Sequence, residues 1–426
     1  MKVAPAGSVE GAVAVPGDKS VSHRAVMLGA IGEGDTIVEN FGLSADTEAT
    51  VRAMRALGVE VVEESADTLR VRGRGLRGLS PPAQPVDCMN AGTLMRLLAG
   101  ILAGQEGRFE LTGDESLSRR PMGRIAEPLQ RMGAHVEMDP PSRPLVVVGG
   151  DLHGIDYELP VASGQVKSAV LLAGLYADGP TTVVEPVATR DHTELMLQAA
   201  GASVRRGPRS VTVQPAQELR LGTIEVPGDF SSAAPFIVAA TLLQGSELFI
   251  RGVGLNPTRT GFLTVLERMG ARITVFNRRR SGGELIGDLE VRSAELVATS
   301  VGASEVPSMV DELPLFALAA ASARGDSLVT GAAELRVKET DRIEAVVDGL
   351  KRLGAHIEAL QDGMRIRGVP ARLRGGTMDS RGDHRIAMVG AIAGLASREG
   401  VEIQGAEAVT VSFPGFFELL ESVAQR

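Results

Sequence analysis

At 426 residues the chain is longer than one hydrophobic core usually serves, so its length predicts two domains. Its 44% hydrophobic content without a long apolar run excludes a membrane-spanning protein, and a net charge of −9 with 3% aromatic residues argues against a nucleic-acid partner. One cysteine and six scattered histidines leave no disulfide and no metal-ligand spacing, so we expect a cytoplasmic protein without a bound metal.

The first predicted helix follows the loop Val15-Pro16-Gly17-Asp18-Lys19-Ser20, and a similar strand, loop and Ala/Leu-rich helix returns five more times. The later loops are, in chain order, 89–93, 162–165, 227–231, 309–312 and 382–385. The marker residues of the six loops are Lys19, Asn90, Ser163, Asp229, Asp311 and Asp383. Their separations are 71, 73, 66, 82 and 72 residues, so six similar units account for the whole chain.

A second pattern alternates with these loops: a helix stopped by glycine and followed at once by a strand. Phe262, Val265, Leu266 and Met269 show the helical spacing that precedes such a glycine. The pattern occurs at 57–61, 132–136, 200–204, 269–273 and 353–357. Strands and helices that alternate in this way predict an α/β fold.

The sequence Val15-Pro-Gly-Asp returns as Val226-Pro-Gly-Asp, which divides the six units into two groups of three. We therefore predict two similar domains, one formed by residues 16–226 and the other by residues 1–15 and 227–426, with an active site in the cleft between them. A non-catalytic scaffold of stacked repeats is the alternative. Such a scaffold predicts interchangeable loops, whereas these loops carry dissimilar polar residues.

The predicted helix starts are anion sites by default, because backbone N–H groups and the positive end of the helix dipole are exposed there. The side chains that add to them are Lys19, Ser20, Arg24, Asn90, Thr93, Ser163, Gln165, Lys167, His384 and Arg385. Ser20 and Arg24 are four residues apart and so share a helix face. An acidic protein with cations at most of its strand-to-helix loops is expected to bind small substrates with several negative charges.

A further charged cluster is Lys338-Glu339-Thr340-Asp341-Arg342. If it opens a helix, Lys338 and Arg342 are i,i+4 neighbours, and Glu339 points away from them and is free for proton chemistry. A solvated, charge-mixed helix start is the other reading. We interpret His23 as a hydrogen-bonded structural histidine and Cys88 as a small buried filler rather than a nucleophile.

Eight motifs, in order along nearly the whole chain, resemble the family of 5-enolpyruvylshikimate-3-phosphate synthases. They are Gly17-Asp-Lys-Ser-Val-Ser-His-Arg24, Asn90-Ala-Gly-Thr-Leu-Met-Arg96, Arg120-Pro121, Ser163-Gly-Gln-Val-Lys167, Arg190-Asp-His-Thr-Glu194, Asn256-Pro-Thr-Arg259, Arg336-Val-Lys-Glu-Thr-Asp-Arg342 and Asp383-His-Arg385. Three of them are similar to the class II branch, several of whose members tolerate the phosphonate inhibitor glyphosate. The resemblance implies two inside-out α/β barrel domains, each of three βαβαββ units, that close on ligand.

The resemblance also implies a transferase that moves the enolpyruvyl group of phosphoenolpyruvate to the 5-hydroxyl of shikimate-3-phosphate. The reaction releases phosphate, needs no cofactor, and belongs to the shikimate pathway to chorismate and aromatic amino acids. The residues implied to bind shikimate-3-phosphate are Lys19, Ser20, Arg24, Ser163, Gln165, Arg190, Asp311 and Lys338. Those implied to bind phosphoenolpyruvate are Lys19, Asn90, Gly92, Arg120, Gln165, Arg342 and Arg385.

Three residues resemble the family's catalytic groups: Asp311 the base that takes the hydroxyl proton, Glu339 the acid that protonates the methylene carbon, and Lys19 a cation close to both. We expect a monomer. The chain departs from some relatives at Gly164, at Glu334, which we leave out of the site, and at Val411, where a lysine contacts phosphoenolpyruvate in some of them.

The sister enzyme, UDP-N-acetylglucosamine enolpyruvyl transferase, is the alternative with the same fold and the same first substrate. It usually carries a cysteine in a loop near the Arg120 region. Residues 111–121 contain none, and Cys88 lies in a different place. The sequence therefore favours the shikimate-3-phosphate enzyme.

Overall fold

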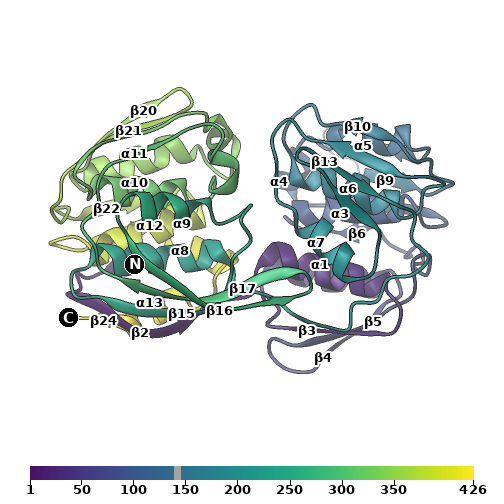
Figure 1. Cartoon of the computed structure of the whole chain (residues 1–426), viewed down its shortest axis with the longest axis horizontal. Coiled ribbons are helices and arrows are strands. Elements are labelled where there is room, and N and C mark those ends of the chain that lie inside the picture. Colours follow the sequence, from purple (N-terminus) through teal and green to yellow (C-terminus); the bar gives the residue numbers. More distant parts are fainter. Residues whose placement is uncertain (139–144) are drawn as a thin grey trace. The chain divides into compact units, whose positions relative to one another are not determined.

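The computed structural model describes residues 1–138 and 145–426, and the chain divides into two compact units (Figure 1). The first unit comprises Gly17–Pro227 together with the short segment Arg280–Glu284. The second unit comprises Met1–Pro16, Gly228–Arg279 and Leu285–Arg426. Each unit has its own hydrophobic core of buried residues.

The first unit contains three four-stranded sheets with one topology: a parallel pair followed by two antiparallel neighbours. The first sheet is β14 (Thr223–Glu225), β3 (Asp35–Glu39), β5 (Leu69–Arg72) and β4 (Glu60–Glu63). The second is β6 (Val86–Asp87), β7 (Arg108–Thr112), β9 (Leu145–Val148) and β8 (His135–Glu137). The third is β10 (Asp156–Glu158), β11 (Thr181–Val184), β13 (Ser210–Val213) and β12 (Val204–Arg206).

The second unit repeats the parallel pair in each of its three sheets. The first sheet is β16 (Arg272–Ser281), β17 (Glu284–Arg292), β15 (Glu247–Gly254), β2 (Ser8–Ala14) and β24 (Ala424–Gln425). The second is β18 (Ser300–Val301), β19 (Gly325–Val329), β21 (Gly363–Gly368) and β20 (His356–Leu360). The third is β1 (Lys2–Val3), β23 (Val401–Gln404) and β22 (Gly376–Asp379), so the start of the chain completes a sheet formed near its end.

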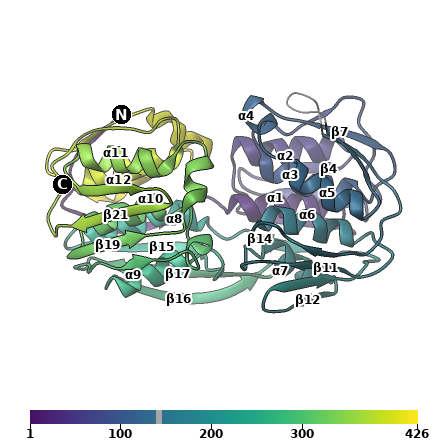
Figure 2. The same cartoon turned by 90° about the horizontal axis from the view of Figure 1, so that it is seen from above.

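Three Ala/Leu-rich helices fill the interior of each unit, and the sheets lie around them (Figure 2). In the first unit these are α1 (Lys19–Ala30), α3 (Gly92–Leu102) and α6 (Gly164–Gly174). In the second unit they are α8 (Phe230–Leu242), α10 (Leu313–Ala321) and α12 (His384–Leu395). All nine residues of α10 are buried, which is why a helix without a polar face is stable there. The inside-out α/β fold expected from the sequence is confirmed.

The outer helices end as the glycine pattern predicts. They are α2 (Ala45–Ala56), α5 (Gly123–Arg131), α7 (His192–Ala199), α9 (Gly261–Arg268) and α11 (Arg342–Arg352). Two further helices, α4 (Glu115–Ser118) and α13 (Phe416–Val423), do not end in this pattern. After α5, Gly133 has a φ of 106° and Ala134 N donates to Leu129 O at 3.0 Å. This left-handed cap ends the helix and sends the chain directly into β8. The same glycine conformation follows the other four long outer helices, so all five predicted junctions are confirmed.

No helix in the described part of the chain is long and apolar enough to cross a membrane.

Candidate active site

The six predicted loops each lead into one of the buried helices, as expected. Four of these helices begin at a side chain that accepts a hydrogen bond from a backbone amide in the first turn: Asp18, Ser163, Asp229 and Asp383. Asp18 Oδ1, for example, accepts from Val21 N at 2.9 Å. Such caps fix the helix start, and with it the predicted site residues of the first turn.

Lys19 opens α1 in the first unit, and 41% of its side chain is exposed. Its Nζ lies 2.7 Å from Oδ2 of Asp46 near the start of α2, a partner that the sequence did not indicate. Arg24, one turn further along α1, is buried, and its Nη1 donates to the backbone oxygen of Ser20 at 2.9 Å. Burial lowers the pKa of Arg24 to about 10, so the guanidinium stays charged at neutral pH.

A second group of predicted residues surrounds the start of α3. Asn90 and Arg120 are in direct contact, because Nη2 of Arg120 donates to Oδ1 of Asn90 at 2.7 Å. Asn90 in turn donates to Asp114 Oδ2 at 2.7 Å. Gly92, the first residue of α3, leaves a gap beside them: a Cβ there would lie 3.0 Å from Arg120 Nη1. The hydrogen bond to Asn90 therefore orients Arg120 beside a space that Gly92 leaves open.

Gln165 connects this group to α6. Its Nε2 donates to Thr93 Oγ1 at 2.9 Å, and its Oε1 accepts a hydrogen bond from Arg96. Ser163 caps the same helix by accepting from Val166 N at 3.3 Å. Arg190 is half-buried in the loop before α7. Arg96 was quoted in a motif but not assigned to the site, and its contact with Gln165 adds a second cation there.

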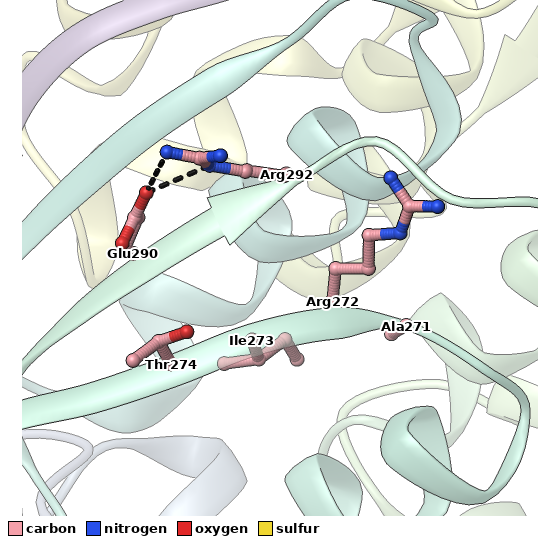
Figure 3. A pocket seen from close by; sticks show the side chains of 6 residues that line it. All are labelled: Ala271, Arg272, Ile273, Thr274, Glu290 and Arg292. Carbon is pink, nitrogen blue, oxygen red and sulfur yellow. Dashed lines mark hydrogen bonds and ion pairs between the residues drawn. The ribbon is translucent and has the colours of Figure 1, made fainter.

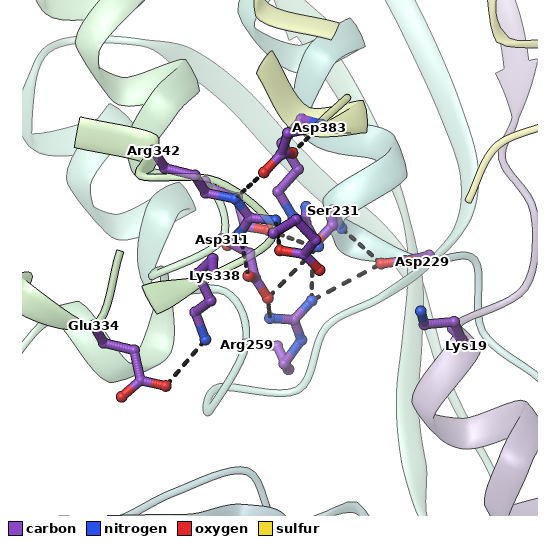
Figure 4. A network of polar contacts seen from close by, with 12 residues as sticks. Lys19, Asp229, Ser231, Arg259, Asp311, Glu334, Lys338, Arg342 and Asp383 are labelled. Atoms are coloured by element: carbon purple, nitrogen blue, oxygen red, sulfur yellow. Dashed lines mark hydrogen bonds and ion pairs between the residues drawn. The ribbon is translucent and has the colours of Figure 1, made fainter. Parts of the chain in front are cut away.

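In the second unit, Arg342 is the centre of a buried ion network (Figure 4). The residue is 1% exposed and opens α11. Its Nε lies 2.8 Å from Asp383 Oδ2, its Nη1 3.3 Å from Asp311 Oδ1, and its Nη2 2.6 Å from Glu339 Oε2. Burying a guanidinium is costly unless it is paired, and three carboxylates supply that pairing here.

Asp311, the predicted base, lies among three arginines. Besides Arg342, it has Arg259 Nη1 and Arg385 Nη2 at 3.6 Å from its Oδ2. Burial alone would lower the pKa of Arg385, but Asp311 and its acidic neighbours more than offset this and raise it, so Arg385 stays charged. The cluster brings together four predicted residues: Asp311, Glu339, Arg342 and Arg385.

Two predictions for residues 338–342 are wrong. The α-helix begins at Arg342, with Asp341 as its cap, so Lys338 and Arg342 are not i,i+4 helical neighbours. Lys338 follows a short 3₁₀ helix (Ala333–Val337) and its Nζ donates to Glu334 Oε1 at 3.1 Å. Glu339 does not point away, because it contacts Arg342 directly. Asp341 caps α11: its Oδ1 accepts hydrogen bonds from the backbone amides of Ile343 and Glu344, so the helix begins only after Asp341.

The groups around Glu339 lower its pKa. Burial is the largest single effect and would raise the pKa of Glu339, but the guanidinium of Arg342, a backbone hydrogen bond and the charges of His384 and Arg385 together outweigh burial and hold the pKa at about 2. Without a ligand, Glu339 is therefore a carboxylate at neutral pH, not a proton donor.

His23 is a structural residue, as interpreted from the sequence. It is fully buried on α1, and its Nδ1 lies 2.5 Å from Thr50 Oγ1. Burial, followed by the charge of Lys19, lowers the pKa of His23 to about 3, so it is neutral at physiological pH. Cys88 is likewise buried, and burial raises the pKa of its thiol, which makes it a poor nucleophile, as expected.

We expect His23 to make the protein less stable in mild acid. The unfolded chain takes up a proton near pH 6.5 that buried His23 refuses until about pH 3, so stability falls as the pH drops between these values. The free energy of unfolding should fall by about 1 kcal/mol more between pH 6 and pH 5 in the wild type than in His23→Asn. Urea titrations at both pH values measure this difference, and equal losses in the two proteins would contradict it.

Several partners of the site residues were missed by the sequence reasoning. Asp46, Asp114, Arg259 and Ser231 contact predicted residues or one another, and Arg259 Nη2 donates to Ser231 Oγ at 2.8 Å. Arg259 was visible in the motif Asn256-Pro-Thr-Arg259, but only the fold brings it to Asp311. The sequence alone does not show which charged residues of distant segments form ion pairs.

A separate shallow hollow of about 460 Å³ lies on β16 and β17 of the second unit (Figure 3). Its lining consists of Ala271, Arg272, Ile273, Thr274, Glu290 and Arg292, and includes none of the predicted site residues. Arg292 is held by Glu290 at 2.6 Å. Within residues 1–138 and 145–426, no group of three or more His, Cys, Asp or Glu side chains is arranged to hold a metal ion.

Comparison with known proteins gives consistent matches over the whole chain. The family described as EPSP synthase (3-phosphoshikimate 1-carboxyvinyltransferase) matches residues 3–420. A 3-phosphoshikimate 1-carboxyvinyltransferase of Desulforudis audaxviator is 52% identical over 425 residues, which is 99% of each chain. One of Alkalilimnicola ehrlichii is also 52% identical, over 98% of this chain and 94% of its own.

Solved structures agree. The EPSP synthase of Acinetobacter baumannii superimposes with a TM-score of 0.93 at 43% identity, covering 99% of this chain and 98% of that one. The enolpyruvyl transferase NikO of Streptomyces tendae has a TM-score of 0.79 at 18% identity, over 99% of this chain and 96% of that one, which shows a shared fold.

Proposed function

Because this chain belongs to the EPSP synthase family of 3-phosphoshikimate 1-carboxyvinyltransferases, we propose that its helix-start loops form the active site for that reaction. The enzyme transfers the enolpyruvyl group of phosphoenolpyruvate to the 5-hydroxyl of shikimate-3-phosphate and releases phosphate. The remaining questions are which residues bind each substrate and which move the protons. The observation that carries our answer is the cluster of Arg342, Arg385 and Arg259 around Asp311, because it combines anion-binding groups with a carboxylate.

For the substrates we retain the assignments implied by the motifs. Shikimate-3-phosphate is bound by Lys19, Ser20, Arg24, Ser163, Gln165, Arg190, Asp311 and Lys338, and phosphoenolpyruvate by Lys19, Asn90, Gly92, Arg120, Gln165, Arg342 and Arg385. The contact between Asn90 and Arg120 supports a shared ligand for those two. We further propose that residues 16–226 and residues 1–15 with 227–426 act as two domains.

The chemistry needs two proton transfers in the addition step and a third in the elimination step. The 5-hydroxyl oxygen attacks C2 of phosphoenolpyruvate and loses its proton to Asp311, while C3 gains a proton from Glu339 and becomes a methyl group. The resulting tetrahedral adduct then returns a C3 proton to the carboxylate of Glu339 as the bond between C2 and the phosphate oxygen breaks, so inorganic phosphate leaves and the enol ether is regenerated. Arginines that contact the phosphate oxygens stabilise the charge that grows on this leaving group.

Glu339 must gain a proton before it can act as the acid. In the ligand-free enzyme the charges around Glu339, with Arg342 foremost, keep it ionised. An anionic phosphoenolpyruvate bound to Arg342 offsets the charge of the guanidinium and repels the carboxylate. Together with the burial of Glu339, these effects raise its pKa above the ordinary range, so that Glu339 takes up a proton. Substrate binding thus prepares the acid, and the same arginine serves as ligand and as control of the proton donor.

Acceptor choice tests the proposed reaction against the sister enzyme. The purified protein is incubated with phosphoenolpyruvate and either shikimate-3-phosphate or UDP-N-acetylglucosamine, and products are identified by mass spectrometry. We expect an enolpyruvyl adduct of shikimate-3-phosphate alone. An adduct of the nucleotide sugar would assign the chain to the other reaction.

Gly92→Ala is expected to weaken glyphosate inhibition more than it weakens phosphoenolpyruvate binding. The new methyl group would lie 3.0 Å from Arg120 Nη1 and 3.2 Å from Arg96 Nη1, so both guanidinium groups must move. Overpacking of this kind costs ~1–3 kcal/mol, or roughly one to two powers of ten in affinity for the longer inhibitor. Inhibition constants for glyphosate and KM for phosphoenolpyruvate measure the two effects.

Gly123→Ala is the matched control, because Gly123 also opens a helix but its added methyl group would only touch Met138 Cε at 3.6 Å. It should leave both constants unchanged. Glyphosate inhibition that is the same in Gly92→Ala as in the wild type would show that this loop does not limit the inhibitor.

We also propose that the enzyme acts as a monomer in the cytoplasm. The buried, unpaired thiol of Cys88 suits a reducing compartment.

A further inference from the structure

Lys167 is a buried cation that is not among the residues assigned to either substrate. It lies on α6, one turn after Ser163 and two residues after Gln165, yet it is only 1% exposed. Its Nζ lies 3.0 Å from Glu185 Oε2 and 2.7 Å from Glu194 Oε1. A buried ammonium is retained only where such partners compensate its lost hydration.

The two carboxylates come from either side of the loop that carries Arg190. Glu185 directly follows β11, and Glu194 lies in the first turn of α7. The eight residues between them include Arg190, so a single lysine holds both ends of this loop.

Glu185 connects Lys167 to the residue next to Arg190. While its Oε2 binds Lys167, its Oε1 accepts from Thr189 N at 3.1 Å and also from the Thr189 hydroxyl. The loop lies directly on the start of α6, since a Cβ at Gly164 would be 3.4 Å from both Arg190 O and Thr189 Oγ1. The chain Lys167–Glu185–Thr189 thus fixes the backbone of the Arg190 loop against the helix start that presents Ser163 and Gln165.

We propose that Lys167 is a positioning residue for the first substrate: through Glu185 and Thr189 it holds Arg190 in register with Ser163 and Gln165. The proposal rests on the assignment of these three residues to shikimate-3-phosphate. Lys167 contacts no reacting atom. It converts a loop and a helix start into one rigid surface, because small displacements of a binding group reduce its contribution steeply.

Two substitutions with the same chemistry separate this role from general stability. Glu185→Gln and Glu194→Gln each replace one buried carboxyl group by an amide of the same shape, and each leaves Lys167 beside the other carboxyl group. Of the two carboxyl groups, only that of Glu185 contacts Thr189, while Lys167 Nζ also reaches the backbone oxygen of Thr189 at 3.5 Å. Glutamine has one acceptor oxygen and can serve either Lys167 or Thr189 but not both, so Glu185→Gln breaks the chain.

Calorimetric titration with shikimate-3-phosphate, without phosphoenolpyruvate, gives the readout. We expect Glu185→Gln to raise the dissociation constant roughly tenfold or more. Glu194→Gln should stay within about twofold of the wild type. Glu185→Gln removes a negative charge, which by itself would strengthen binding of an anion, so a loss of affinity in this variant has to come from displaced groups.

A double-mutant cycle with Arg190→Ala identifies the group that is displaced. If Glu185 acts through Arg190, then Glu185→Gln should change the dissociation constant by less than about twofold in the Arg190→Ala background. Additive losses, an unchanged constant in Glu185→Gln, or equal losses in both glutamine variants would overturn the proposal. A wild-type protein that does not bind shikimate-3-phosphate at all would instead contradict the proposed function.

Discussion

Lys19→Met is expected to abolish turnover, a loss of at least ~10³-fold in kcat, without a change in melting temperature. The side chain opens α1 and is 41% exposed, so its replacement by an apolar chain of similar length removes a charge and little packing. The lost ion pair with Asp46 is partly solvated and contributes little to stability. We attribute the loss to the role of Lys19 in binding both substrates and in promoting the proton transfers.

Two control variants make this result specific. Lys351→Met removes an exposed lysine from the last turn of α11 and should retain full activity. Asp46→Asn removes the partner of Lys19 but keeps its charge, and we expect it to retain most of the activity. A Lys19→Met protein with an unchanged melting temperature and undiminished turnover would refute the assignment of the site.

Glu339→Gln is expected to lower kcat by ~10²–10⁴, the usual range for the loss of a general acid. The amide keeps the shape of the side chain and can still accept from Arg342, so the buried ion network should remain intact. Its specific effect should be slow incorporation of solvent deuterium into the methylene group of phosphoenolpyruvate, followed by mass spectrometry in the presence of shikimate-3-phosphate.

Asp311→Asn tests the transfer of the hydroxyl proton, and Glu344→Gln is the control. Asp311→Asn should also lose turnover, because the hydroxyl proton then has no acceptor. Glu344→Gln changes an acidic residue in the first turn of α11 and should leave turnover unchanged. Normal deuterium incorporation in Glu339→Gln would mean that another group, for which Lys19 is the candidate, protonates the carbon.

The sequence predicted the local structure well wherever a short segment determines its own conformation. Gly58, Gly133, Gly201, Gly270 and Gly354 all end helices, because left-handed caps depend on a single residue without a side chain. The six buried helices were visible from their composition, since a helix without a polar face has to lie inside a protein.

The interactions between distant segments were not accessible in this way. Asp341 caps α11, so the helix does not begin at Lys338. The sequence analysis missed this cap, because a helix that begins at Lys338 and a helix that begins after Asp341 are both rich in charged residues. The lowered pKa of Glu339 depends on the orientation of the Arg342 guanidinium. Three carboxylates from different loops determine that orientation. Such pairings arise when the repeats fold together and leave no signal in the spacing of residues.

Release of inorganic phosphate from phosphoenolpyruvate tests the central claim most directly. The purified protein is assayed with phosphoenolpyruvate alone, with shikimate-3-phosphate alone, and with both, and Lys19→Met is measured beside it. We predict steady phosphate release only when both substrates are present, and none above background in the variant. Phosphate release from phosphoenolpyruvate without shikimate-3-phosphate, or no release with both, would contradict the account.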